Sequence, residues 1–409
     1  MSTPHTLPGS GRGLLIIDLD GAGSHPAARR VSPAAPDAAL DPGHVRGAVL
    51  AAESAGFHAA TFSDPGLPDT APAERPGAWA AARLNALQRA AFAGPVTRSL
   101  ALIPEVDTVY TEPFHISTQL ASLDYVSGGR AGWLVAASTS AADAAAVGRE
   151  TVRGARLAGE AADSIEVGRR LWDSWEDDAV IRDVPTGRYL DVDKLHYVDV
   201  ETDNYFVKGP SIIPRPLQGQ LPVLAPAGLL APEAVAAGAA DALLVSAPTP
   251  GLLAAELAET RAALSAGTAG TASGASGPAL IAELDIVLDA RGQAATERLA
   301  VLDGHAAWQS PRARFAGTAA ELTELLTEVL AVADGVRLHP AVLDTDLEEL
   351  SRLVLPELRR RGLLAPNAPD ATLRDQLGLA RPASRYAAAA SAAVPSPKPA
   401  STTAAGAEN

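Results

Sequence analysis

The stretch that most constrains the fold of this 409-residue chain is Thr111–Ser138, TEPFHISTQLASLDYVSGGRAGWLVAAS. It begins with Pro113, whose missing N–H costs nothing in the first turn of a helix. Apolar residues then recur at helical spacing, namely Phe114, Ile116, Leu120, Leu123 and Val126. Ser127 is followed by two glycines, which suit a left-handed helix end, and Gly132–Ala137 is a short apolar run without polar alternation. A helix followed at once by a strand buried on both faces is typical of parallel α/β sheets and barrels.

The rest of the chain repeats this alternation of strand and helix. Seven further runs are predicted as strands: Gly13–Asp20, His58–Ser63, Arg98–Val106, Pro222–Ala227, Ala242–Ser246, Ala279–Leu288 and Val336–His339. Further helices are predicted at His44–Gly56, Ala78–Phe92, Asp163–Trp175, Pro232–Ala240, Gly251–Ser265, Gln293–His305, Ala319–Val332 and Thr345–Arg361. Eight strands that alternate with helices predict an α/β fold of the (β/α)₈ TIM-barrel type. A doubly wound open sheet is the alternative, but DLDGAG at 18–23 does not match the GxGxxG loop of such folds.

Two segments fall outside this repeat. Residues 177–220, after the fourth strand, are polar and rich in proline and glycine, with short strand-like pieces at 188–190, 195–198 and 205–207. A segment of this length inside an α/β chain is typical of an insertion. Residues 386–409 are alanine, serine, proline and threonine without periodicity, which indicates a disordered tail. The predicted organisation is one barrel domain, 1–385, followed by that tail.

Composition excludes several classes of function. The formal net charge of −15 leaves no basic stripe for phosphate backbones, so we expect no nucleic-acid partner. The N-terminus lacks a signal-peptide core and no run approaches the roughly 20 apolar residues of a membrane span, so we expect a soluble, cytoplasmic protein without a membrane partner. The chain has no cysteine, which excludes disulfides and thiolate chemistry. Its histidines form no HxH or HExxH pattern, so no metal site is predicted.

Polar residues stand at the predicted carboxyl ends of the strands, which a barrel brings to one mouth. They are Asp18, Asp20, Asp64, Asp107, Thr108, Ser138 to Ser140, Gly228, Ser246 and His339. Each alone is more typical of a loop or helix cap than of a catalytic group, but together they define a candidate site. The acidic residues of WDSWEDD, 172–178, are interpreted as a solvated helix end flanked by two packing tryptophans.

The run PFHxxxxxASLDxxSGGRAGWxVxxS, 113–138, resembles the signature of the bacterial-luciferase-like flavin monooxygenases. More narrowly, it is similar to the branch that contains nitrilotriacetate monooxygenase, dibenzothiophene-sulfone monooxygenase and the large subunit of pristinamycin synthase. Further segments agree with that branch, namely SHPAARR at 24–30, LWDSWEDDAV at 171–180, HYVDVETDNYFVKGPSIIPRPLQGQLPVLAPAG at 196–228 and the closing 354–386.

The resemblance implies a two-component, FMN-dependent monooxygenase. Reduced FMN would come from a separate NAD(P)H:flavin reductase and react with O₂, after which one oxygen is transferred to a small organic substrate. The matched flavin positions are Asp64, Thr108, Ser138 and Gly228, since hydroxyls can donate to the ring edge and a glycine lets N–H groups approach the phosphate. His25, in the first long loop, is predicted as the general acid/base, with a loop-ordering hydrogen bond as its alternative role. Family barrels usually dimerise, so a homodimer is implied as well.

Departures from the family pattern concern the flavin site. Leu134 replaces an asparagine, Leu229 and Leu230 occupy the place of a phosphate-binding serine, and no tyrosine stands near Arg156. The absence of one hydrogen bond to a phosphate costs on the order of 1–3 kcal/mol. Arg153 and Arg156 are predicted to compensate, because guanidinium groups bind phosphate well.

Two alternatives therefore stay open. One is a barrel that has lost flavin and serves as a non-catalytic subunit or binder, which the leucine replacements motivate. The other is a deazaflavin-dependent oxidoreductase of the same superfamily, against which the 177–220 insertion follows the FMN branch. The sequence does not identify the substrate, since the loops are rich in alanine, glycine and proline and carry no charge pattern that would indicate its class.

Overall fold

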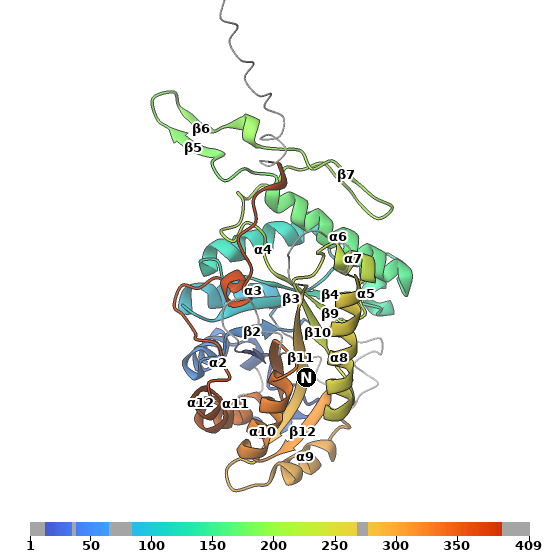
Figure 1. Ribbon diagram of the computed structural model, residues 1–409, viewed down its shortest axis with the longest axis vertical. Helices are drawn as coiled ribbons and strands as arrows, with labels where there is room; N and C mark the ends of the chain where they lie inside the picture. Colours follow the sequence, from blue (N-terminus) through green and yellow to red (C-terminus); the bar gives the residue numbers. More distant parts are fainter. Residues whose placement is uncertain (1–12, 35–37, 65–83, 268–276, 387–409) are drawn as a thin grey trace, which may run out of the picture.

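Eight parallel strands form the wall of a closed barrel (Figure 1). They are β1 (Leu14–Asp18), β2 (Ala59–Phe62), β3 (Ala101–Asp107), β4 (Trp133–Ala136), β9 (Val223–Pro226), β10 (Ala242–Val245), β11 (Ala279–Leu288) and β13 (Gly335–Pro340). Their order is β10-β9-β4-β3-β2-β1-β13-β11, and β10 pairs with β11 to close the ring. This computed structural model describes residues 13–34, 38–64, 84–267 and 277–386. The predicted (β/α)₈ fold is confirmed.

A ninth strand, β12 (Ala313–Gly317), was not predicted from the sequence. It pairs in parallel with Leu284–Leu288, the second half of β11. Only the first four residues of β11, Ala279–Ala282, pair with β10, so the rest of that edge is open to another strand. The sequence ARFAG carries little signal for this pairing, because β12 is short and most of it is only partly buried.

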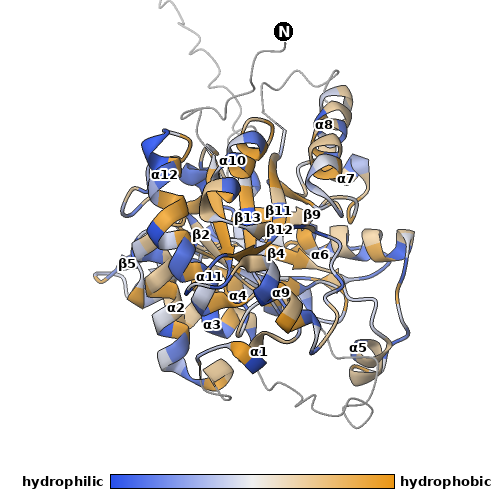
Figure 2. Cartoon of the chain, turned by 90° about the horizontal axis from the view of Figure 1, so that it is seen from below, coloured by the Kyte–Doolittle hydropathy of each residue, from blue (hydrophilic) through white to orange (hydrophobic). Residues whose placement is uncertain are grey.

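Helices surround the barrel. They are α1 (Ala28–Val31), α2 (Pro42–Ala55), α3 (Ala86–Ala93), α4 (Pro113–Ser127), α5 (Ala141–Ala146), α6 (Ala155–Asp173), α7 (Pro232–Ala236), α8 (Pro250–Gly267), α9 (Ala295–Asp303), α10 (Ala319–Leu330), α11 (Leu343–Glu349), α12 (Leu355–Arg360) and α13 (Leu373–Gln376). Figure 2 shows hydrophobic residues concentrated on the central strands, while hydrophilic residues lie on outward helix faces. Leu120 of α4 and Leu253 of α8 are fully buried in the apolar layer between helices and strands.

The stretch 111–138 folds as the sequence predicts. Glu112 caps α4 by accepting hydrogen bonds from the N–H groups of Phe114 and His115, at 2.8 and 3.2 Å. The helix ends at Gly128, whose φ of +68° is the left-handed conformation that glycine adopts without strain. The inward placement of Val126 is wrong: it is 50 % exposed, because it lies in the last turn of α4, where the turn at Gly94 contacts only part of it.

The helices predicted at 78–92, 163–175 and 345–361 need correction as well, and the second of them begins earlier, at Ala155. The helix predicted at 78–92, whose spacing would turn Trp79, Leu84 and Leu87 inward, begins within the described residues only at Ala86, because Asn85 caps it. Leu87 is buried, Leu84 lies exposed before the cap, and Trp79 lies outside the described residues. The closing helix is interrupted by a π-helical turn, Leu350–Val354. That turn shifts the periodicity by one residue, so Leu353, which the apolar spacing of the predicted helix would turn inward, is 51 % exposed.

The insertion forms two small antiparallel hairpins near α6, beyond one end of the barrel (Figure 1). Strands β5 (Val180–Asp183) and β6 (Arg188–Leu190) make the first, and β7 (Val200–Glu201) and β8 (Phe206–Val207) the second. The piece predicted at 195–198 is not a strand; Leu195 makes one isolated bridge to Trp175. Tyr386, the first residue of the predicted tail, stacks on His196 at 4.8 Å, and the remainder of the tail lies outside the described residues.

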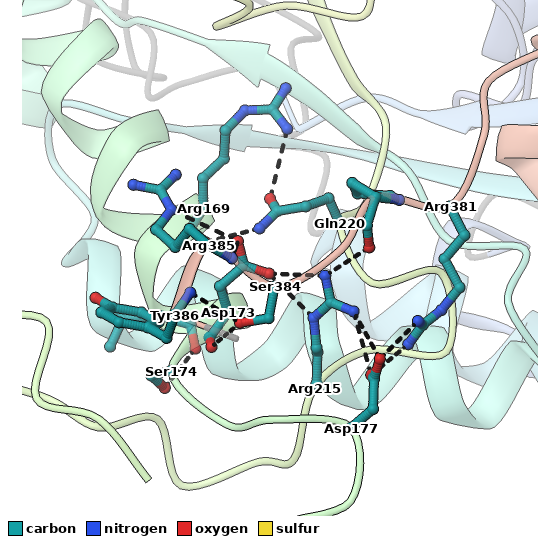
Figure 3. Close-up of polar contacts among 12 residues, drawn as sticks. Arg169, Asp173, Ser174, Asp177, Arg215, Gln220, Arg381, Ser384, Arg385 and Tyr386 are labelled. Carbon is teal, nitrogen blue, oxygen red and sulfur yellow. Dashed lines mark hydrogen bonds and ion pairs between the residues drawn. The ribbon is translucent and has the colours of Figure 1, made fainter. Parts of the chain in front are cut away.

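Part of the WDSWEDD run is buried in an ion-pair cluster, so its interpretation as a solvated helix end is wrong for Asp173, whereas Asp177 and Asp178 are exposed and both tryptophans are buried. Arg215 lies between Asp173 and Asp177, donating from Nε to Asp173 at 3.0 Å and from Nη1 to Asp177 at 3.1 Å (Figure 3). Arg381 donates to the same Asp177 at 2.6 and 2.9 Å. Arg215 also donates to the carbonyl oxygen of Pro382. The cluster therefore fastens the C-terminal segment to α6 and the insertion.

Replacing Asp177 by asparagine should lower the free energy of unfolding by about 0.5–1 kcal/mol, because its partner Arg381 is half-exposed. Hydrogen bonds from Arg381 hold the pKa of Asp177 at about 2, against burial and with help from Arg215. A lowered pKa stabilises the fold above the unfolded value, and that stabilisation is lost as the pH falls toward 2. Urea unfolding at pH 7 and pH 3 measures the difference, which should shrink at pH 3. The neighbouring, more exposed Asp178→Asn is the control; an equal loss in both variants would contradict the role of the cluster.

The interior of the barrel has two halves of different polarity. The lower half, toward the amino ends of the strands, is apolar, and the upper half, toward their carboxyl ends, is polar. The lower half holds alternate strand residues, including Ile16, Ile103 and Leu134, and Leu373 of α13 packs against it. Alternation along a strand returns a side chain to the same face every second residue. The next inward positions toward the carboxyl ends are mostly polar, which places the candidate site there.

Candidate active site

A network of buried polar side chains fills the carboxyl end of the barrel. Its centre is Arg337 of β13, 5 % exposed, which donates from Nη2 to Asp18 at 2.8 Å and from Nη1 to Glu283 at 2.9 Å. Its Nε donates to Thr61 of β2 at 2.9 Å. Burial alone would raise the pKa values of Asp18 and Glu283, but Arg337 and His339 outweigh it and hold both below their usual range. The two carboxylates therefore stay charged and neutralise the guanidinium.

His339 and Ser246 extend this network across the mouth. His339 Nε2 lies 3.1 Å from Glu283, and its Nδ1 lies 3.8 Å from Asp18. Ser246, at the end of β10, donates to the second oxygen of Glu283 at 2.5 Å. Of the residues predicted at the strand ends, Asp18, Ser246 and His339 are thus brought together.

Glu105 of β3 also lies at the carboxyl end of the barrel, and its side chain is half-buried. It forms a hydrogen bond with the hydroxyl of Ser63, which itself donates to Asp18 at 3.0 Å. Burial raises the pKa of Glu105 to about 7, although Arg337 opposes the shift. A carboxyl that titrates near neutral pH can give or take a proton under physiological conditions.

Thr108 and Ser138 lie beside each other in the loops after β3 and β4, with their hydroxyls engaged. Thr108 donates to the carbonyl oxygen of Ala136 at 2.8 Å, and Ser138 donates to Asp143 at 2.5 Å. The carboxylate of Asp107 accepts from the N–H of Ser138 at 2.6 Å and orders the loop. Both predicted flavin residues therefore approach the mouth, but each donates to the protein.

Gly228 lines a groove of about 1160 Å³ between the start of α6 and the end of β9, together with Gly154 and Ala155. Gly228 has φ +82° and nothing within 4 Å of where a Cβ would lie. Helix α6 has Gly154 as its N-cap and no side-chain cap, so its first N–H groups are open to a ligand. Leu229 and Leu230 line the groove, and Arg153 and Arg156 are exposed on either side of its lining residues Gly154 and Ala155, with Arg153 donating to the carbonyl oxygen of Thr139 at 3.3 Å. Open N–H groups beside two cations suit an anion such as a phosphate.

Asp64 and His25 have structural contacts. Asp64 accepts from the side chain of Asn85 at 2.6 Å and from the N–H of Ala86 at 3.3 Å, at the start of α3. His25 is 2 % exposed: Nδ1 accepts from the N–H of Ala27 at 3.0 Å and Nε2 lies 3.2 Å from Asp303. Burial lowers the pKa of His25, against the effect of Asp303. This geometry corresponds to the loop-ordering role that the sequence also allows, and the acid/base role of His25 stays a prediction.

Sequence reasoning missed the centre of the network, namely Thr61, Ser63, Glu105, Glu283 and Arg337. The signal was present: Glu283 and Asp285 stand two apart in ALIAELDIVL, and Arg337 and His339 stand two apart in VRLH. Charges at one face of an otherwise apolar strand point inward when the opposite face packs on helices. Among the described residues, no three acidic or histidine side chains form a metal-binding group, and no helix there is long and apolar enough to span a membrane.

A closed parallel barrel with its polar groups at the carboxyl ends of the strands defines the class of (β/α)₈-barrel enzymes. Residues 23–345 match the model of the luciferase-like monooxygenase family. The chain belongs to that family, whose members are flavin-dependent oxidoreductases.

Named relatives agree with the branch that the sequence motifs indicate. N-acetyl-S-(2-succino)cysteine monooxygenase of Bacillus subtilis is 28 % identical over 356 residues, covering 71 % of this chain and 80 % of the relative. Nitrilotriacetate monooxygenase component A of Aminobacter aminovorans is 28 % identical over 351 residues, covering 70 % and 77 %. Dibenzothiophene-sulfone monooxygenase of Rhodococcus erythropolis is 35 % identical over a shorter 155 residues, covering 37 % and 34 %.

Solved structures confirm the fold. Long-chain alkane monooxygenase superposes with a TM-score of 0.77 at 19 % identity, covering 90 % of this chain and 95 % of that one. Riboflavin lyase, solved with modified FMN and riboflavin, gives 0.73 at 21 % identity, covering 89 % and 96 %.

Proposed function

We propose that this chain is the oxygenating component of a two-component monooxygenase that uses reduced FMN and acts on a small organic substrate. The observation that carries the proposal is the groove at Gly228 and α6, which presents open N–H groups, with the exposed Arg153 and Arg156 adjacent in sequence to its lining residues Gly154 and Ala155. Bound reduced flavin would supply the O₂ chemistry, and the barrel would hold the substrate in a site shielded from water.

The donor set fits the phosphate of FMN better than its ring. Gly228, the N–H groups of α6, Arg153 and Arg156 would hold the phosphate. The hydroxyls of Thr108 and Ser138 already donate to Ala136 and Asp143, so toward a ring they act as acceptors. Leu134 lies in the apolar lower half of the barrel, and so gives the ring no polar contact.

The partners follow from the same proposal. One relative is named component A, which supports a separate partner, and we infer that this partner is an NAD(P)H:flavin reductase. The homodimer and the cytoplasmic location stay predictions from the sequence.

Gly228→Ala should weaken the binding of reduced FMN about tenfold, because a Cβ would enter the open space above the groove. The matched control is Gly148→Ala, since Gly148 also has a positive φ, +68°, and nothing within 4 Å of a Cβ. Both variants carry the same kind of backbone strain, on the order of 1 kcal/mol, so a loss of FMN binding only in Gly228→Ala reports the site.

Anaerobic titration of the purified chain with reduced FMN, followed by absorbance and fluorescence, measures this. Micromolar binding by the unmodified chain supports the proposal. Failure to bind at hundreds of micromolar would overturn it and favour the flavin-deficient binder, which the engaged hydroxyls and the carboxylate of Asp143 also favour. The same titration with a deazaflavin tests the third alternative.

A further inference from the structure

Glu105 faces the interior of the barrel at the boundary between its apolar and polar halves. Ala101 and Ile103 of β3 belong to the interior apolar cluster. Because every second residue of a strand faces the same side, Glu105 faces the interior as well. Its neighbour across the sheet is Leu134 of β4. Glu105 thus lies between the charged side chains of the network and the apolar side chain of Leu134.

The hydrogen-bond donors around Glu105 are already committed to other carboxylates. Arg337 donates at 2.8 Å to Asp18 and at 2.9 Å to Glu283. Ser63 has one hydroxyl proton, for which Asp18 is an acceptor at 3.0 Å. Glu105 is therefore the third carboxyl beside a single guanidinium, and burial raises its pKa although Arg337 and the hydrogen bond with Ser63 oppose the shift.

Exposure separates Glu105 from the other carboxyls of the network. Asp18 is 5 % exposed and Glu283 8 %, and both are held by Arg337, whereas Glu105 is only half-buried. A molecule bound in the mouth can therefore reach Glu105 without breaking the ion pairs of Arg337.

We propose that Glu105 is the acid–base residue of this site, passing its carboxyl proton to a basic oxygen or nitrogen of the molecule bound in the barrel mouth. In this step the O–H bond of the carboxyl breaks, a new O–H or N–H bond forms on the bound molecule, and the carboxylate takes a proton back from solvent. The inference rests on the proposed function for the identity of the reaction, but the protonation of Glu105 is independent of flavin.

The charged groups that face Glu105 set the direction of its pH dependence. They are Arg337 of β13 and Asp18 and Asp20 of β1 and its loop, with Ser63 after β2 as the hydrogen-bond partner. Burial raises the pKa to about 7, so the folded protein holds this proton more tightly than the unfolded chain. The resulting stabilisation is present below the unfolded pKa and is lost as the pH rises through about 7.

The first test titrates Glu105 directly in the full chain without flavin. Carbon-13 NMR of protein labelled at the glutamate carboxyl should show one resonance with a midpoint near pH 7, absent in Glu105→Gln and retained in the exposed control Glu201→Gln. A Glu105 resonance with an ordinary midpoint, between about pH 4 and 5, would overturn the inference whether or not flavin binds.

The second test uses reduced FMN and O₂ as probes. The rate at which the loaded chain oxidises reduced FMN should show an inflection near pH 7 that Glu105→Gln removes, with a fall of roughly 10²-fold at neutral pH and FMN affinity unchanged within about twofold. Glu105→Asp should keep the inflection, which separates a proton role from a packing role. An unchanged profile in Glu105→Gln would overturn the inference, whereas failure of the unmodified chain to bind reduced FMN would overturn the proposed function first.

Discussion

Replacing Arg337 by methionine should lower the free energy of unfolding by about 3–5 kcal/mol, because it leaves two buried carboxylates without their cation. Asp18 and Glu283 contact Arg337 at 2.8 and 2.9 Å, and the three side chains are at most 10 % exposed. Methionine fills the space of the arginine side chain only as far as Nε and supplies no donor. The loss therefore reports the uncompensated charges together with the space that the guanidinium leaves.

Urea unfolding at pH 7 measures this loss. The control is Arg352→Met, whose partner Glu348 is 3.5 Å away and whose side chain is 64 % exposed, so its change should stay within about 0.5 kcal/mol. Adding Asp18→Asn and Glu283→Gln to Arg337→Met should recover part of the loss. Because the pKa values of both carboxyls are lowered, the gap between wild type and Arg337→Met should narrow as the pH falls below about 4. A loss below about 1 kcal/mol at pH 7 would contradict this account.

Arg130→Met should cost at least about 3 kcal/mol, because Arg130 bonds several buried carbonyl oxygens at once. Its guanidinium donates to the carbonyls of Gly94, Thr97, Leu100 and Ser127 and to the hydroxyl of Thr97, at 2.6 to 2.9 Å. These acceptors lie between the end of α3 and the turn after α4. The arginine of the SGGR motif thus joins two connections of the barrel, and no carboxylate pairs with it in the described part of the chain.

Chemical denaturation of Arg130→Met beside Arg130→Lys and the exposed Arg46→Met tests this role. Lysine has three donors and no planar fork, so it should recover only part of the loss, while Arg46→Met should remain within about 0.5 kcal/mol of wild type. If lysine restored full stability, charge alone would explain the position, and the account based on several acceptors would be wrong.

The two arginines stabilise different parts of the enzyme. Arg130 stabilises the connections between helices and strands, since it donates hydrogen bonds to turns outside the barrel. Arg337 stabilises the candidate site itself, because it holds Asp18 and Glu283 by hydrogen bonds. We therefore expect substitutions of Asp18 and Glu283 to change the stability loss caused by Arg337→Met. The same substitutions should leave the stability loss caused by Arg130→Met unchanged.

The sequence by itself determined the barrel, most of its helices and the family. Local patterns fix these features: glycine at a left-handed helix end, apolar runs of strand length and helical spacing such as that of 113–127 belong to neighbouring residues. The same patterns failed where a pairing depends on a distant edge, as for β12, and where a π-helical turn shifted the periodicity at 350–354.

Only the tertiary structure decided which polar residues form the site. Asp18, Glu283 and Arg337 lie far apart in the chain, and closure of the barrel alone brings their strands to one mouth. The sequence assigned the acid/base role to His25, whose ring nitrogens contact Ala27 and Asp303 in the structure. Glu105, in the middle of an apolar strand, was not predicted as a site residue. Burial and the competition of three carboxyls for one guanidinium, which no local pattern records, set the charge on each group.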